Sequence, residues 1–253
     1  MAHYSRCTPT GKLTTLYSFC AQSGCTDGYN PQAGFLQAPN GNFYGTTLGG
    51  GEDGDYGTFF TITPGGTLTT VYRFCSKSGC ADGYNPSSQL VQAINGDFYA
   101  TASAGGAHGQ GTIFKMTQTG TLTTLHSFCA KGCTTGGYYA TAGLVQSTNG
   151  TFYGTTYEGG TEGAGTVYSL AVGLGPFVET QPTSGKLEAA VKILGTNLTG
   201  ATSVTFNGTA AVFKVVSSSE ITTTVPTGAT SGTVEVTTSQ GALKSNVNFL
   251  VIP

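Results

Sequence analysis

A repeat of 54 to 55 residues constrains this chain more than any other feature of its sequence. Three glycines that each open a G-[KT]-L-T-T segment mark the repeat, and Gly11, Gly66 and Gly120 are spaced 55 and 54 residues apart. A second motif recurs in step with them, as FYGTT at 43–47, FYATA at 98–102 and FYGTT at 152–156. A period of this length indicates supersecondary units that stack or are arranged radially.

One repeat reads as four short strands. In residues 33–74 apolar residues alternate over four segments, joined by an Asn40-Gly41 turn, a glycine-rich loop and a Pro64-Gly65-Gly66 turn. Tight connections between alternating segments are typical of an antiparallel meander. A four-stranded meander followed by a longer link is the blade of a β-propeller. A helical solenoid is excluded, because no segment shows a 3.6-residue period.

The number of predicted blades is small. Residues 88–128 supply a second whole blade, residues 142–172 supply three strands of another, and residues 3–19 supply two strands of an earlier one. Closed propellers usually have roughly four to eight blades. Three alternatives follow. The chain is a fragment of a longer array, its copies form a homo-oligomer that closes the ring, or it is an open arc with exposed strand edges that invite pairing.

The composition changes near residues 172–176, which read as a linker. Beyond it, short alternating strands are separated by turn signals about every ten residues, a pattern typical of a β-sandwich. We therefore predict an all-β protein with two domains. Residues 1–173 form a propeller-like repeat domain of about three repeats, and residues 174–253 form an immunoglobulin-like sandwich.

These motifs resemble two known families. The string LTTLYSFC…C-x-DGYNP-x-AG…NG-x-FYGTT resembles the GloVer repeat of large exported bacterial proteins over residues 3 to about 172, and residues 176–253 are similar to the IPT/TIG immunoglobulin-like domain. The resemblance implies propeller-type repeats that end in surface anchors, with the second domain as a spacer or interaction module. It implies no reaction. The third repeat departs from the pattern, since residues 134–139 read TTGGYY where the others have DGYNP.

Six of the seven cysteines fall in pairs at the same place in successive repeats, and these are Cys20/Cys25, Cys75/Cys80 and Cys129/Cys133. We predict a disulfide within each pair that pins the link between blades. Zinc bound by the pairs is the alternative. It is disfavoured because each pair lies in a different repeat and no histidine accompanies it at finger spacing.

Charge and targeting signals limit the location and the partners. Charged residues make up only 9% of the chain and the formal net charge is −2, with no run of lysine or arginine, which argues against nucleic-acid binding. No apolar run is long enough to span a membrane. The chain begins without the apolar core of a signal peptide. Sparse charge and paired cysteines nevertheless suggest an extracellular or cell-surface protein, so we expect that Met1 is not the natural start.

Candidate sites lie in the links and loops. Tyr29-Asn30 and Tyr84-Asn85 recur on the links, where a tyrosine ring can stack on a glycan and an asparagine can hydrogen-bond to it. An acidic loop contains Glu52, Asp53 and Asp55. The loop is either simply solvated or it binds Ca²⁺ through its carboxylate and carbonyl oxygens.

A weak catalytic candidate is His108, in the glycine-rich loop of the second repeat. No adjacent residue orients it as a base.

The leading functional hypothesis is a non-enzymatic, exported binding or scaffold protein for glycans or other surface ligands, with no cofactor apart from the possible Ca²⁺. The alternative is a hydrolase of the esterase, lactonase or phosphotriesterase type, with a metal or histidine site on a propeller face. The sequence contains neither a G-x-S-x-G nor an H-E-x-x-H motif.

Overall fold

Among the residues that the structure describes, nearly all of the regular secondary structure is β-strand. The computed structural model describes residues 3–7, 11, 13–51, 55–130, 133 and 136–253. The chain divides into two compact parts, a repeat part of residues 1–145 with 153–169 and a C-terminal part of residues 146–152 with 170–253. Within the described ranges, no helix has the length and apolar character that crossing a membrane requires.

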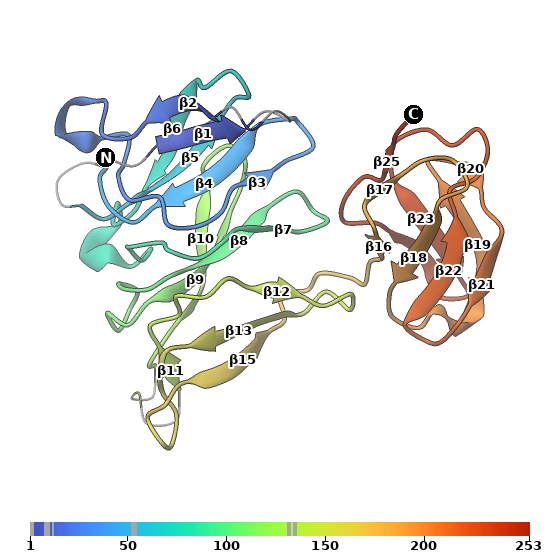
Figure 1. The fold of residues 1–253 in the computed structure, drawn as a ribbon. Helices are drawn as coiled ribbons and strands as arrows, with labels where there is room; N and C mark the ends of the chain where they lie inside the picture. Colours follow the sequence, from blue (N-terminus) through green and yellow to red (C-terminus); the bar gives the residue numbers. More distant parts are fainter. Residues whose placement is uncertain (1–2, 8–10, 12, 52–54, 131–132, 134–135) are drawn as a thin grey trace. The chain divides into compact units, whose positions relative to one another are not determined.

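Two complete antiparallel blades form the centre of the repeat part (Figure 1). In each, four strands are hydrogen-bonded in chain order, as the sequence predicts. The first blade consists of β3 (Leu36–Gln37), β4 (Phe43–Thr47), β5 (Thr58–Ile62) and β6 (Leu68–Arg73). The second consists of β7 (Val91–Gln92), β8 (Phe98–Ala102), β9 (Thr112–Met116) and β10 (Leu122–Ser127).

Incomplete blades flank these two, also as predicted. The N-terminal pair β1 (His3–Cys7) and β2 (Leu13–Ser18) corresponds to the third and fourth strands of a blade. The third blade has the order β12-β13-β15, with β12 (Val145–Gln146), β13 (Phe152–Thr156) and β15 (Thr166–Leu170). A short pair, β11 (Gly137–Tyr138) with β14 (Glu158–Gly159), joins the third link to its loop. The repeat domain is thus a propeller-like array.

Alternation along the strands gives each blade two faces. In the first blade Tyr44, Thr46 and Phe59 point toward the second blade, where the Tyr44 ring lies 4.5 Å and the Phe59 ring 5.5 Å from the ring of Phe98 (centroid distances). We call this the forward face. On the opposite side Phe60 packs against Phe19, which follows β2. We call that the backward face. The core of the array therefore lies between successive blades.

The C-terminal part is a β-sandwich. One sheet has the order β16 (Glu179–Gln181), β18 (Ala190–Leu194), β22 (Glu220–Thr224), β21 (Phe213–Val215). The other has the order β20 (Thr209–Ala210), β19 (Ala201–Phe206), β23 (Val234–Thr238), β24 (Gly241–Lys244). A parallel pair, β17 (Ser184–Gly185) with β25 (Leu250–Val251), accompanies them.

Inward residues of both sheets form the sandwich core, in which the Phe206 and Phe249 rings meet at 90° with centroids 5.1 Å apart. Val, Ile, Leu and Phe dominate this core, which contains neither the Cys pair nor the Trp of antibody domains.

Candidate functional site

Each link and the glycine-rich loop of the same repeat lie at one end of the blades. The loop follows the second strand and the link precedes the first, and both lie opposite the Asn-Gly turns because the strands are antiparallel. Backbone bridges join the two segments at Tyr29 with Gly49, at Tyr84 with Ala104 and at Tyr138 with Glu158. We call this region the link end.

A buried aspartate organises the second link. The Asp82 carboxylate is fully buried and accepts hydrogen bonds from the Tyr72 hydroxyl at 2.6 Å and from the backbone N–H groups of Ser76 and Lys77 at 3.0 and 3.2 Å. The disulfide Cys75–Cys80 closes the same segment. The link is therefore held by Tyr72 on β6, the last strand of the preceding blade, together with its own aspartate and disulfide.

The first link repeats this arrangement. Asp27 is also fully buried and accepts hydrogen bonds from the Tyr17 hydroxyl at 2.7 Å and from the backbone N–H of Ala21 at 2.9 Å. Burial, followed by the hydrogen bond with Asp27, raises the pKa of Tyr17 to about 12. Burial, followed by the hydrogen bond with Asp82, also raises the pKa of Tyr72. Both phenols stay neutral at physiological pH, which suits a structural role.

In the sequence each of these aspartates precedes a glycine, as in an Asp-Gly turn, and that turn pattern does not predict the tyrosine contact. A signal was available in the repeats. Tyrosine and aspartate stand ten positions apart in the first two links, at Tyr17/Asp27 and Tyr72/Asp82. In the third link histidine and threonine replace both of them, at His126 and Thr135. The third pair of cysteines, Cys129 and Cys133, is bonded like Cys20 and Cys25 in the first link.

The asparagines predicted to bind a ligand also serve the backbone. Asn30 and Asn85 each have φ of 53°, in the left-handed region that asparagine tolerates. The Asn85 side-chain amide donates to the Leu48 carbonyl at 2.8 Å, and its backbone N–H donates to the Tyr56 carbonyl at 2.9 Å. Asn85 thereby ties its link to the loop of the preceding blade.

Tyrosines form the accessible surface of the link end. Tyr29, Tyr56, Tyr84 and Tyr138 are half-buried and Tyr139 is 39% exposed. The Tyr56 and Tyr84 rings meet edge to face with centroids 5.4 Å apart, and the Tyr138 and Tyr139 rings do so at 5.1 Å.

Carboxylates accompany two of these tyrosines. A hydrogen bond with Glu158, followed by burial, raises the pKa of Tyr138. Burial, followed by a hydrogen bond with Asp55, raises the pKa of Tyr29. The link end thus places aromatic rings beside carboxylate oxygens.

The structure describes His108 and one residue of the predicted acidic loop. Asp55 is exposed with φ of 62°, whereas Glu52 and Asp53 lie outside the described residues. Over the part of the chain that the structure describes, no group of three His, Cys, Asp or Glu side chains is arranged to hold a metal ion. His108 is exposed, and its charge contributes to lowering the pKa of His126.

The repeated motifs match a known family over most of the chain. A model of the Gloeobacter/Verrucomicrobia repeat matches residues 3–178. The chain belongs to the Gloeobacter/Verrucomicrobia repeat family. A model of the IPT/TIG domain matches residues 178–251. A repeat array joined to an IPT/TIG domain fits a binding or scaffold module.

Solved structures similar to this Gloeobacter/Verrucomicrobia repeat protein are distant. One is named as a gluconolactonase, with 12% identity and a TM-score of 0.37 over 86% of this chain and 64% of that one. Another is the γ-CGTase of alkalophilic Bacillus clarkii, with 20% identity and a TM-score of 0.30 over 64% of this chain and 25% of that one. The chain thus spans less than two thirds of the length of either. No curated protein matches it.

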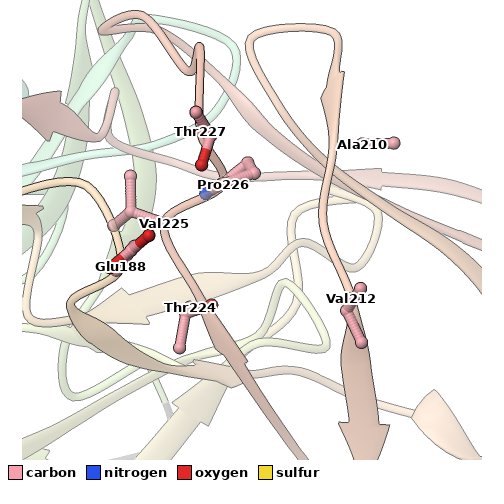
Figure 2. A pocket seen from close by; sticks show the side chains of 7 residues that line it. All are labelled: Glu188, Ala210, Val212, Thr224, Val225, Pro226 and Thr227. Atoms are coloured by element: carbon pink, nitrogen blue, oxygen red, sulfur yellow. The ribbon is translucent and has the colours of Figure 1, made fainter.

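The IPT/TIG domain of the repeat protein carries an open pocket of about 440 Å³ that sequence reasoning did not identify. Figure 2 shows its lining side chains, which are Glu188, Ala210, Val212, Thr224, Val225, Pro226 and Thr227. Glu188 contributes the one ionisable side chain of this lining, and its backbone N–H donates to the Val225 carbonyl at 2.8 Å. With a single carboxylate among mainly aliphatic groups, the pocket offers contact surface rather than an acid–base pair.

Proposed function

We propose that this protein is an exported, cell-surface binding module whose link end recognises glycans. The observation that carries the proposal is the placement of half-buried tyrosine rings beside carboxylates, at Tyr138, which pairs with Glu158 across β11 and β14, and at Tyr29 with Asp55. The three disulfides support an oxidising, extracellular location. The IPT/TIG domain would then act as a spacer or a second contact surface.

The chemistry of the link end suits a sugar. A tyrosine presents an apolar ring face on which the C–H face of a sugar ring can stack, together with a hydroxyl that can hydrogen-bond. Carboxylates accept strong hydrogen bonds from hydroxyl groups. Because the first and third repeats each place a link tyrosine beside a loop carboxylate, two such positions lie at the link end. Repeated weak contacts of this kind add avidity for a polymer.

Affinity electrophoresis of the whole chain in gels that contain laminarin, xylan or galactomannan tests this proposal. We expect at least one polysaccharide to retard the protein, and Tyr138→Ala, Tyr139→Ala and Glu158→Gln each to weaken that retardation about tenfold, the loss of one stacking or charged contact of ~1.4 kcal/mol. The matched control is Tyr153→Ala, which removes a tyrosine of similar exposure, 42% against 39% for Tyr139, from near the start of β13, at the strand end away from the link end.

Two results would overturn the proposal. One is the absence of retardation by every polysaccharide for a protein that circular dichroism shows to be folded. The other is equal weakening by Tyr153→Ala and Tyr139→Ala. The Ca²⁺ prediction at Glu52, Asp53 and Asp55 is tested in the same gels with added Ca²⁺ or a chelator. A contribution of that loop requires Ca²⁺-dependent retardation that Asp55→Asn abolishes.

A further inference from the structure

In the part of the chain that the structure describes, the third blade has three strands where the complete blades have four. Its order is β12-β13-β15, whereas β5 and β9, the third strands of the complete blades, pair with β6 and β10. After β15 the chain continues into the IPT/TIG domain, which matches residues 178–251. Figure 1 shows β15 at the border of its sheet, so one edge of this strand is open among the described residues.

Backbone groups of β15 point to the open edge. Successive N–H groups of a strand point to opposite sides. The N–H of Thr166 points inward, since it donates to the Thr156 hydroxyl on β13 at 2.9 Å. The N–H and C=O groups of Val167 and Ser169 therefore face the open edge.

The complete blades show what binds at this edge. In the first blade the Gly57 carbonyl accepts the N–H of Phe74, the residue after β6, at 3.0 Å. In the second blade the Gly111 carbonyl accepts the N–H of Phe128, the residue after β10, at 3.0 Å. Gly165 holds the same place before β15. The equivalent edge thus binds the fourth strand of a repeat.

The side chain at the end of β15 fits a strand of the same kind. Each fourth strand begins with a leucine opposite the last residue of the third strand, as Leu68 lies opposite Ile62 and Leu122 opposite Met116. Leu170 is the equivalent residue of β15, and it is half-buried. It offers an incoming leucine a cross-strand partner.

β15 also lacks the features by which proteins protect an open edge. Its sequence, TVYSL, contains no charged residue and no proline. Val167 exposes 79% of its surface. An edge of this kind accepts an added strand, whose backbone supplies affinity and whose side chains supply specificity.

We infer that an extended segment of another protein adds to β15 as the fourth strand of the third blade. The segment carries the pattern shared by β6 and β10, which is Leu-Thr-Thr, an apolar residue, and then tyrosine or histidine. It runs antiparallel to β15, with its leucine opposite Leu170 and its first threonine opposite Ser169, as in the pairing of β5 with β6. This site binds protein rather than glycan, so it is independent of the function proposed above.

A fluorescein-labelled peptide with the sequence of residues 66–74, GTLTTVYRF, tests the inference by fluorescence anisotropy with the full chain. We expect saturable binding that Ser169→Pro weakens at least about tenfold, because proline removes one N–H from the open edge. Proline is tolerated where an edge N–H faces solvent, so the variant should keep the melting temperature of the unmodified chain. The matched control is Tyr157→Ser, which removes a side chain 72% exposed just beyond β13 and leaves the edge intact.

Methylation of single backbone nitrogens of the peptide separates strand pairing from side-chain contact. In β6 the N–H of Thr69 faces its partner Thr61, since the pair two residues along, Thr63 with Thr67, is hydrogen-bonded at 3.0 Å. The N–H of Thr70 points to the other side. Methylation at the nitrogen of Thr69 should therefore abolish binding, and methylation at that of Thr70 should preserve it.

Four results would overturn the inference. The first is a peptide that shows no saturable binding to the folded chain. The second is equal binding of the two methylated peptides. The third is a Ser169→Pro variant that binds the peptide like the unmodified chain. The fourth is a Tyr157→Ser variant that loses as much affinity as Ser169→Pro, because the peptide would then lie on the exposed side chains of the blade and not along the edge of β15.

Discussion

The ring of Phe74, which follows β6, meets the ring of Phe114 on β9 edge to face, with centroids 5.1 Å apart. The same contact recurs between Phe19 and Phe60 at 5.1 Å and between Phe128 and Tyr168 at 5.4 Å. Each time, the aromatic residue after a fourth strand packs on the third strand of the following blade. The same ring contact therefore helps to hold neighbouring blades together at three successive interfaces.

Removing one ring of this contact should strongly destabilise the repeat part. Phe114 is fully buried, so Phe114→Ala loses the burial of its ring and leaves a cavity between two blades. We expect the free energy of unfolding to fall by about 3–5 kcal/mol. Urea unfolding followed by circular dichroism measures this loss. Val212→Ala, at an exposed position, should change it by less than about 0.5 kcal/mol. A loss below about 1 kcal/mol for Phe114→Ala would contradict this role.

Two substitutions at the buried aspartate of the second link should lower the free energy of unfolding by different amounts. Tyr72→Phe removes one charge-assisted hydrogen bond to Asp82 and should cost about 1.5–3 kcal/mol. Asp82→Ala should cost more, since it also leaves the backbone N–H groups of Ser76 and Lys77 without their acceptor. Thermal unfolding of both variants measures the order. Tyr139→Phe, which changes an exposed tyrosine, serves as the control. Equal stability of Tyr72→Phe and the unmodified chain would show that the hydrogen bond is not needed.

The contact between Tyr72 and Asp82 also shows a limit of prediction from the sequence. Alternation and turn residues predict the four strands of each blade and the sandwich, because these depend on neighbours along the chain. The hydroxyl of Tyr72 reaches Asp82 across a link whose path depends on the disulfide and the buried carboxylate together. A turn rule describes Asp82 with its neighbour Gly83 and contains no information about that path.

The candidate site was predictable to a similar extent. The recurrence of Tyr29 and Tyr84 points to the links, which the structure places beside the glycine-rich loops, and a binding role for these tyrosines stays a prediction. That Asn85 donates to the Leu48 carbonyl of the preceding blade could not be predicted, because it depends on how one twisted sheet stacks on the next. The exposure of Val167 on β15 escaped prediction for the same reason, since it depends on what packs against that side chain.

The glycine that directly precedes the third strand of each blade should tolerate no side chain. Gly111 has φ of 100°, and a Cβ atom there would lie 2.6 Å from the Ala102 carbonyl oxygen. Its equivalents Gly57 and Gly165 would place a Cβ 2.4 Å from the carbonyl oxygens of Thr47 and Thr156.

We therefore expect Gly111→Ala to cost roughly 3 kcal/mol or more, since the backbone of β8 must move. Gly109→Ala is the matched control in the same loop. Gly109 has φ of 74° but open space around its Cβ position, so only the left-handed backbone opposes alanine, at about 1–2 kcal/mol. Chemical unfolding of the two variants separates steric overlap from backbone preference. Equal losses would show that the close approach to Ala102 is relieved without cost.

The second blade should respond to mild acid through His126 on β10. This histidine stands where the other repeats have Tyr17 and Tyr72, and its ring meets Phe128 edge to face at 5.1 Å. Partial burial of the side chain, followed by the nearby charge of His108, lowers the pKa of His126 below 6.5. The unfolded chain therefore binds this proton more readily than the folded one, so stability is full above pH 6.5 and falls as the pH drops through the folded-state pKa.

The effect should be small, because much of the His126 side chain is exposed. Melting temperatures measured from pH 7.5 to 5.0, with the ionic strength held constant, test the direction. His126→Tyr has no group that titrates in this window, so its stability should fall less over that range than that of the unmodified chain. His108→Ala removes the second cause alone and should give an intermediate slope. If His126→Tyr and the unmodified chain lose stability in parallel, the pH response arises elsewhere and the assignment to His126 is wrong.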